Sequence, residues 1–283
     1  MGKETKPIQT QSKHVLSGVE WANLDSCLYY RIYIYSNPLA ATKGYHNFRR
    51  ILLMKKTTLI CSLLFIFSLA SAKYTPTSDY SVRKIQGWKI LVNKELLSGH
   101  PKLAKDTLKL LRFQLYQITR VIPKEALKEL RRIPIWVEYK APRHPCMCYH
   151  PSKQWLTNND FNPEKAKSVE IANAENFLTW TSGQPWMVLH ELAHSYHHWV
   201  LGYDNKQINQ AYQKMVESKK YDSVLHIAGK NRRAYSLNND QEYFAECTEA
   251  FFGTNDFYPF VRAELKQHDP DMYQVLKEVW KVK

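Results

Sequence analysis

Four histidines lie within nine positions of QPWMVLHELAHSYHHWVLG, residues 184–202. The first two, His190 and His194, are four residues apart, so on a helix they project from the same face, one turn from each other. Two imidazoles arranged in this way can bind one metal ion. Glu191 lies between them, where a carboxylate can take a proton from an activated water. The string HELAH is thus the H-E-x-x-H pattern of zinc peptidases.

The other two histidines do not fit a ligand role. A pattern in which this helix supplies a third histidine requires glycine at position 197 and histidine at position 200, but the sequence has His197 and Val200. Helical rotation carries His198 away from the same ion. We therefore expect the third ligand to come from elsewhere. The alternative is a core helix that carries histidines by chance, although two buried imidazoles would then need other polar partners.

Three glutamates downstream could complete such a site. The segment AYSLNNDQEYFAECTEAFFG, residues 234–253, contains Glu242, Glu246 and Glu249 along one side of an expected helix. Two histidines and one glutamate are a known set of ligands for catalytic zinc. The glutamates stand among phenylalanines, where an unpaired carboxylate is costly to bury. The alternative is an amphipathic helix with a solvated acidic face.

The two motifs together resemble a known family. HELAH, followed 48 residues later by the string EYFAE that begins at Glu242, resembles the gluzincin peptidases of the anthrax lethal factor type. The resemblance covers about residues 168–253. It implies a zinc metallopeptidase in which Glu242 binds zinc and Glu246, one turn later, supports the site by orienting a ligand histidine. It also implies that Tyr235, seven residues before Glu242, assists catalysis.

The expected chemistry is hydrolysis of a peptide bond with one Zn²⁺ per chain. Zinc held by His190, His194 and Glu242 would lower the pKa of bound water and polarise the scissile carbonyl. Glu191 would act as the general base and later pass the proton to the leaving amine. Tyr235 would donate a hydrogen bond to the developing oxyanion.

The expected partner is a peptide or protein substrate, and a strand near residues 168–178 is expected to be the edge strand that pairs with it. Two other functions stay open. One is a secreted, non-catalytic binding module on the same scaffold. The other is an amidase that acts on cell-wall peptides.

The order of elements predicts an α+β fold, because strands come first and helices later. Strands are expected within residues 80–97, 133–140 and 168–174, and helices at 101–122, 123–132, 185–201, 206–219, 240–252 and 270–281. The segment 141–166 is expected to be a loop. The resemblance implies a zincin-like arrangement, with a small twisted sheet, an active-site helix that carries the H-E-x-x-H motif and a mainly helical C-terminal part.

A secretory signal peptide is predicted at residues 54–72, MKKTTLICSLLFIFSLASA, from its basic start, apolar run and small residues at the cleavage site. Residues 1–53 are then expected to be an upstream extension that is not part of the native protein. Residues 73–283 would form one secreted, periplasmic or extracellular domain. The apolar run is short for a membrane span, so no stable membrane insertion is expected after cleavage. The alternative is an uncleaved anchor with a short cytosolic tail.

The formal charge of +14 does not predict a nucleic-acid partner. The positive residues are spread along the chain, without an arginine-rich block or a zinc-finger or RNA-binding signature. A mildly basic surface is the simpler interpretation.

Three cysteines follow the predicted signal peptide: Cys146, Cys148 and Cys247. Cys146 and Cys148 are too close for an ordinary disulfide with each other. One bridge to Cys247 with one free thiol is an open alternative. The Cys-x-Cys pair could also suggest a metal site, but no matching second pair exists, so a structural role is predicted.

Overall fold

The computed structural model describes residues 8–9, 74–142 and 144–282. All of these described residues belong to one compact unit of the chain. The predicted signal peptide and nearly all of residues 1–53 lie outside them, so the expectations about these segments stay predictions.

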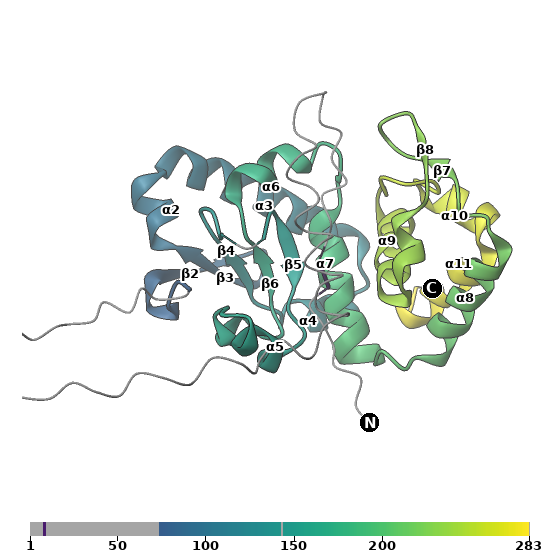
Figure 1. Cartoon of the computed structure of the whole chain (residues 1–283), viewed down its shortest axis with the longest axis horizontal. Helices are drawn as coiled ribbons and strands as arrows, with labels where there is room; N and C mark the ends of the chain where they lie inside the picture. The colour runs from purple at the N-terminus through teal and green to yellow at the C-terminus, as the bar shows by residue number, and fades with distance from the viewer. Residues whose placement is uncertain (1–7, 10–73, 143, 283) are drawn as a thin grey trace, which may run out of the picture. The chain divides into compact units, whose positions relative to one another are not determined.

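Six strands of the described residues form one small mixed sheet (Figure 1), in the order β1-β5-β6-β4-β3-β2. Its strands are β1 (Ile8–Gln9), β2 (Tyr80–Ile85), β3 (Trp88–Asn93), β4 (Ile135–Val137), β5 (Met147–Tyr149) and β6 (Val169–Ile171). Strands β3, β4 and β6 run parallel, whereas β2, β5 and β1 pair antiparallel with their neighbours. Gln86 and Gly87 connect β2 to β3 with positive φ angles, as tight hairpin turns require.

Alternation along the strands gives the sheet two different faces. One face contributes apolar side chains to the main core: Ile90, Val92, Ile135, Val137, Met147, Tyr149, Val169 and Ile171. The helices of the N-terminal part whose buried residues join this core are α2 (Lys94–Gly99), α3 (Pro101–Val121), α4 (Lys124–Leu130), α6 (Ala174–Trp180) and α7 (Met187–Tyr196). The opposite face carries a small separate cluster of Tyr80, Leu91 and Trp136.

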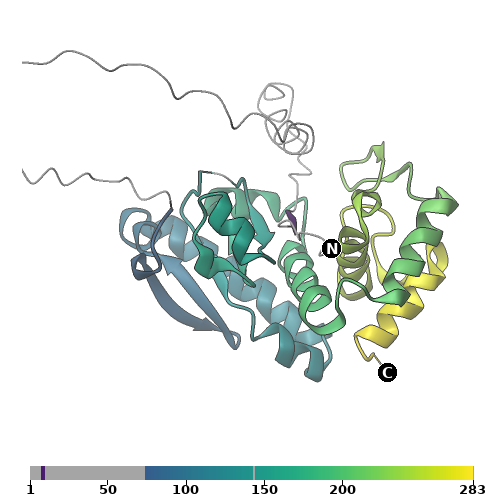
Figure 2. The same ribbon diagram turned by 60° about the horizontal axis from the view of Figure 1, so that its bottom comes forward.

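The C-terminal part is mainly helical. It contains α8 (Lys206–Ser218), α9 (Asp240–Phe252), α10 (Arg262–His268), α11 (Pro270–Val279) and a short ribbon of β7 (Val224–Leu225) and β8 (Asn231–Arg232). Helix α9 lies beside α7 in both views (Figure 1, Figure 2). The Trp280 ring stacks on Tyr196 of α7, with centroids 4.1 Å apart, and on Phe244 of α9 at 5.9 Å. These aromatic contacts hold the two helices together.

Most of the elements expected from the sequence are present, and the α+β class is confirmed. The segment 141–166 is not a continuous loop, since it contains β5 and the helix α5 (Lys153–Asn158). The expectation that residues 168–178 supply an edge strand is wrong, because β6 is paired on both sides and residues from Ala174 onward form α6. In the sheet order, β5 lies between β6 and the two-residue strand β1, so β6 is not at the edge.

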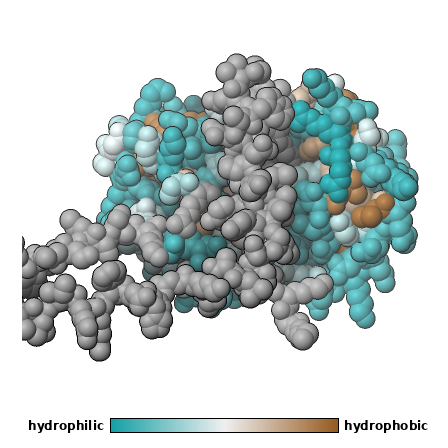
Figure 3. Space-filling model, viewed as in Figure 1, coloured by the Kyte–Doolittle hydropathy of each residue, from teal (hydrophilic) through white to brown (hydrophobic). Residues whose placement is uncertain are grey.

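The surface of this unit is largely hydrophilic on the face drawn in Figure 3, where hydrophobic residues form small scattered groups. Among the described residues, none of the helices combines the length and the apolar character that a membrane crossing requires.

Candidate metal centre

Helix α7 carries the H-E-x-x-H motif, and every one of its residues is buried. The helix begins after Trp186, and Pro185 stands just before it. From His197 to Leu201 the chain continues as a π-helical turn, η4, which ends at Gly202 with a φ of 78°. π-Helical turns often stand at functional sites, because the extra residue redirects the side chains that follow.

Helix α9 presents its glutamates to α7. The Asn239 side chain accepts a hydrogen bond of 2.8 Å from the Glu242 backbone N–H, which caps the helix and fixes Glu242 in its first turn. Glu242, Glu246 and Glu249 are only 1%, 1% and 2% exposed. The alternative of a solvated acidic face is therefore wrong, and these carboxylates need buried partners.

His190, His194 and Glu242 converge on one point. Nε2 of His190 lies 3.1 Å from Oε2 of Glu242, and Nε2 of His194 lies 3.3 Å from the same oxygen. Zinc ligands about 2.0–2.1 Å from a tetrahedral ion are roughly 3.3 Å apart. The three donors thus have the types and the spacing that zinc takes, and together they form one of the candidate ligand groups of this structure.

Glu249 orients the first histidine. Its Oε1 accepts a hydrogen bond of 2.6 Å from Nδ1 of His190, which leaves Nε2 to face Glu242 and His194. Glu246, to which the resemblance assigned this contact, has its Oε1 3.9 Å from the same nitrogen. Its Oε2 instead accepts a hydrogen bond of 3.2 Å from Asn255. In this structure, the contact expected of Glu246 is therefore made by Glu249.

Tyr235 approaches the same centre from another element, whereas Glu191 lies on α7 between the two histidines. Tyr235 begins the 3₁₀ turn η5 (Tyr235–Asn238), and its hydroxyl donates a hydrogen bond of 3.3 Å to Oε1 of Glu242. Glu191 is fully buried on α7. The pKa of the thiols of Cys146 and Cys148 is raised by burial first and also by the Glu191 charge. Helix α7, which carries Glu191, packs against β5.

The electrostatics of the centre favour a cation between the carboxylates. Burial alone would raise the pKa of Glu242, but His194 and His190 outweigh it and lower that pKa to about 2. Burial alone would lower the pKa of His190, but Glu242 and Glu249 raise it well above its ordinary value. Three buried carboxylates, those of Glu242, Glu246 and Glu249, lie within 3.9 Å of the His190 ring nitrogens, and a divalent cation would offset this excess of acidic groups.

His197 and His198 do not belong to this donor group. His197 is fully buried beside Phe244 and Tyr203, with ring centroids 4.9 and 5.1 Å away. Burial, and then the nearby His194 and His198, lower its pKa to about 3, so it is neutral. Nδ1 of His198 lies 2.9 Å from the Tyr149 hydroxyl, and its ring stacks on Tyr203.

The three cysteines among the described residues are buried and free. None of Cys146, Cys148 and Cys247 forms a disulfide, so the open alternative of a bridge to Cys247 is not realised in this structure. Cys247 lies on α9, whereas Cys148 lies on β5.

Comparison with known proteins finds a family similarity over the segment that contains this candidate centre. Residues 149–279 match the family model described as Anthrax toxin lethal factor, N- and C-terminal domain. No curated protein and no solved structure gives a significant match. The matched residues include α7, η5 and α9, and hence all the side chains of the candidate centre. The part of the chain that carries this centre is therefore similar to the lethal factor family.

Proposed function

We propose that this chain is a secreted zinc metallopeptidase with a zincin-like active site of the gluzincin type. The observation that carries the proposal is the convergence of the His190 and His194 Nε2 atoms on one carboxylate oxygen of Glu242. A glutamate stands between the two histidines in the helix, and the segment is similar to the lethal factor family. Motif, geometry and similarity each support the proposal of metal-assisted hydrolysis.

Each residue of the centre has a separate role in the proposed hydrolysis. His190, His194 and Glu242 would hold Zn²⁺, which supplies the positive charge that acidifies water and polarises a carbonyl. Glu191 takes the proton from the attacking water and passes it to the leaving amine. The Tyr235 hydroxyl, held near the centre by Glu242, donates a hydrogen bond to the oxyanion of the substrate. Glu249 keeps Nε2 of His190 directed at the centre.

A peptide or protein substrate suits the edge of the sheet beside α7. Strand β5 pairs antiparallel with β1, with Ile8 opposite Tyr149 and Gln9 opposite Cys148. This edge of β5 can therefore accept an extended segment of chain, and α7 packs against β5. An extended substrate paired in this way would lie beside α7, the helix that carries Glu191.

Secretion is part of the proposal and is tested by mass. Cleavage after Ala72 would give a secreted product that begins at Lys73, which intact-mass measurement of the culture medium would detect. If the cells instead retain a product whose mass includes residues 54–72, the uncleaved anchor is favoured. No nucleic-acid partner is proposed, because the positive charge of the sequence is spread along the chain.

The experiment that tests the function compares zinc content and cleavage in three forms of the full chain. Glu242→Ala should lose one equivalent of zinc relative to the parent, whereas Glu191→Ala should keep all of it. A peptide library should be cleaved by the parent and not by Glu191→Ala. If Glu242→Ala keeps the parent's zinc, the ligand assignment is refuted. Zinc binding without cleavage would favour the binding module, and cleavage of cell-wall amides alone would favour the amidase.

A further inference from the structure

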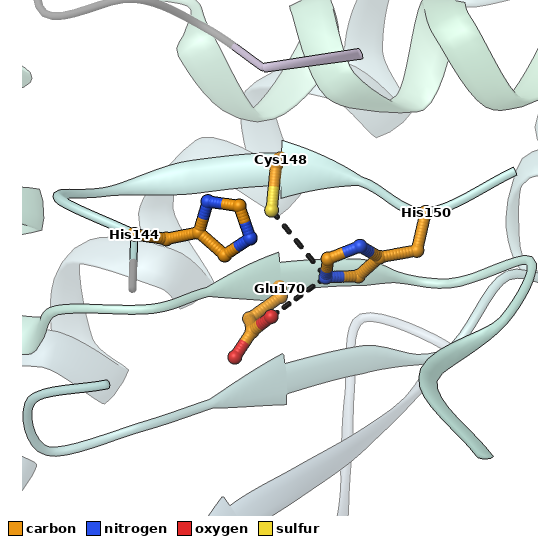
Figure 4. Close-up of side chains that lie close together, drawn as sticks. All are labelled: His144, Cys148, His150 and Glu170. Atoms are coloured by element: carbon orange, nitrogen blue, oxygen red, sulfur yellow. Dashed lines mark hydrogen bonds and ion pairs between the residues drawn. The ribbon is translucent and has the colours of Figure 1, made fainter. Parts of the chain in front are cut away.

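A second group of potential ligands lies on the opposite face of the sheet. Cys148 of β5 and Glu170 of β6 are directly paired across the two strands, so their side chains share one face. His150 follows Cys148 by two residues and points to the same side. His144 comes from the segment before β5. Figure 4 shows the Cys148 sulfur and the Glu170 carboxylate between the two imidazole rings.

The spacing of these four groups is close to that of a tetrahedral metal site. The Cys148 sulfur lies 3.4 Å from Nε2 of His150, and that nitrogen lies 2.6 Å from Oε2 of Glu170. One ligand atom from each of the four residues lies within 4.8 Å of all the others. Ligands at zinc–nitrogen, zinc–oxygen and zinc–sulfur distances would be roughly 3.3–3.6 Å apart. A pair at the upper limit of 4.8 Å would have to approach by roughly 1.2–1.5 Å to form the site.

The charges around the group also suit a divalent cation. The four side chains are at most 4% exposed. Lys165 contacts Glu170 at 2.6 Å and also pairs with Glu138, which in turn accepts hydrogen bonds from Tyr80 and Asn93. A thiolate and the Glu170 carboxylate would neutralise a dication, while Lys165 and Glu138 neutralise each other. The buried cluster would then carry no net charge.

A polar network without metal explains these contacts only in part. Hydrogen bonding from His150 through Glu170 and Lys165 to Glu138 requires neither the sulfur of Cys148 nor a second imidazole. Nδ1 of His150 is buried and has no hydrogen-bond partner among the described residues. Two histidines, a cysteine and a carboxylate are all donors that zinc takes, and four protein ligands are typical of closed, structural sites.

We propose that His144, Cys148, His150 and Glu170 bind a second zinc ion, whose role is structural. It would join β5 and β6 to the segment that precedes β5. Strand β5 is only three residues long, so a bound ion would stabilise its position. This proposal does not depend on the peptidase function, because the two groups share no residue.

The test uses the Glu242→Ala variant of the full chain. This variant lacks one of the three proposed ligands of the centre on α7. After loading with Zn²⁺ and removal of excess, this variant should retain about one zinc. Adding Cys148→Ala should remove that ion, whereas adding Cys247→Ala, which removes another buried free thiol, should not. A Glu242→Ala chain without zinc, or a zinc content unaffected by Cys148→Ala, would overturn the proposal.

Cobalt gives a second measurement that does not need the cysteine variant to fold. Co²⁺ loaded into Glu242→Ala should show the near-ultraviolet charge-transfer band of a thiolate ligand. The donors proposed on α7 and α9 include no sulfur, so cobalt bound at that centre would not give the band. Bound cobalt without the band, or no bound cobalt, would refute the cysteine-containing site. The absence of metal from the centre on α7 would not change this thiolate-to-cobalt band, because that centre contributes no sulfur ligand.

Discussion

Replacing Glu249 by glutamine tests which glutamate of α9 supports the centre. The 2.6 Å hydrogen bond joins Oε1 of Glu249 to Nδ1 of His190. Glutamine keeps the size of the side chain and an acceptor oxygen but removes the negative charge. The matched control is Glu246→Gln on the same helix, because Glu246 is equally buried and has its Oε1 3.9 Å from the same nitrogen.

The magnitude follows from the kind of bond that is lost. Removing the partner of a ligand histidine costs about 10- to 100-fold in metal affinity, which corresponds to roughly 1.4–2.8 kcal/mol. A charged hydrogen bond is about twice as strong as a neutral one. Glu249→Gln should therefore weaken zinc binding by about 10-fold and Glu249→Ala by about 100-fold. Glu246→Gln removes no hydrogen bond to His190, so its effect should be smaller than that of Glu249→Gln.

The assay is peptide cleavage by the full chain in buffers of fixed free zinc concentration. The midpoint of the activity curve should report the affinity of the α7 centre alone, because catalysis is proposed at this centre and not at the second one. The midpoint should move to higher zinc in the order Glu246→Gln, Glu249→Gln, Glu249→Ala. A larger shift for Glu246→Gln than for Glu249→Gln would refute the assignment from geometry and favour the one from the family resemblance.

Three further changes test the surroundings of the centre. Tyr235→Phe should keep zinc and lower kcat by about 10²-fold, as loss of one oxyanion donor does; unchanged kcat would remove Tyr235 from the mechanism. Burial lowers the pKa of His197 from 6.5 to about 3. Between these two pH values, His197 is protonated in the unfolded chain and neutral in the folded chain. The stability from neutral His197 is present above pH 6.5 and is lost as the pH falls towards 3, by at most about 1.4 kcal/mol per pH unit. Urea unfolding of zinc-free protein should therefore show a weaker acid dependence in His197→Phe, and an unchanged slope would contradict the buried neutral state. A Cβ at Gly253 would overlap the Trp186 ring, so Gly253→Ala should lower the free energy of unfolding by about 1–3 kcal/mol. The double variant Gly253→Ala/Trp186→Leu should be destabilised by less than the sum of the two single variants, because the smaller leucine leaves room for the added Cβ. If the two single effects simply add, the clash is refuted.

The elements of the first centre could be predicted because its residues stand on regular helices. The four-residue spacing of His190 and His194 specifies one face of a helix whatever surrounds it. The downstream helix was expected at residues 240–252, and α9 covers the same residues. The pairing of the two helices required the resemblance, since periodicity alone does not say which helices come together.

The choice between Glu246 and Glu249 could not be made from the sequence. Both project from the side of α9 that faces α7, and both are buried. Which of them reaches Nδ1 of His190 depends on the rotation of α9 and on where it crosses α7. Contacts such as the stacking of Trp280 on Tyr196 and Phe244 help to set that geometry. A helical pattern contains no information about such tertiary contacts.

The second group was missed for a different reason. Strand β5 has three residues in a segment rich in proline and polar residues, which is too short for an alternating pattern to stand out. Cys148 and Glu170 become neighbours through the register of β5 against β6. A search for paired Cys-x-Cys motifs could not find this group, because its other ligands are histidines and a carboxylate.

The alternation of β5 connects the two centres. Cys148 and His150 point to the proposed structural site, whereas Tyr149 points to the opposite face, where its hydroxyl contacts His198 in the turn after α7. The edge of the same strand is the one that pairs with β1. A metal that fixes Cys148 and His150 therefore also fixes the strand that packs against the H-E-x-x-H helix and would align a peptide beside it. Because a three-residue strand has few backbone hydrogen bonds of its own, this anchoring from the opposite face gives the second site a physical role in positioning the substrate.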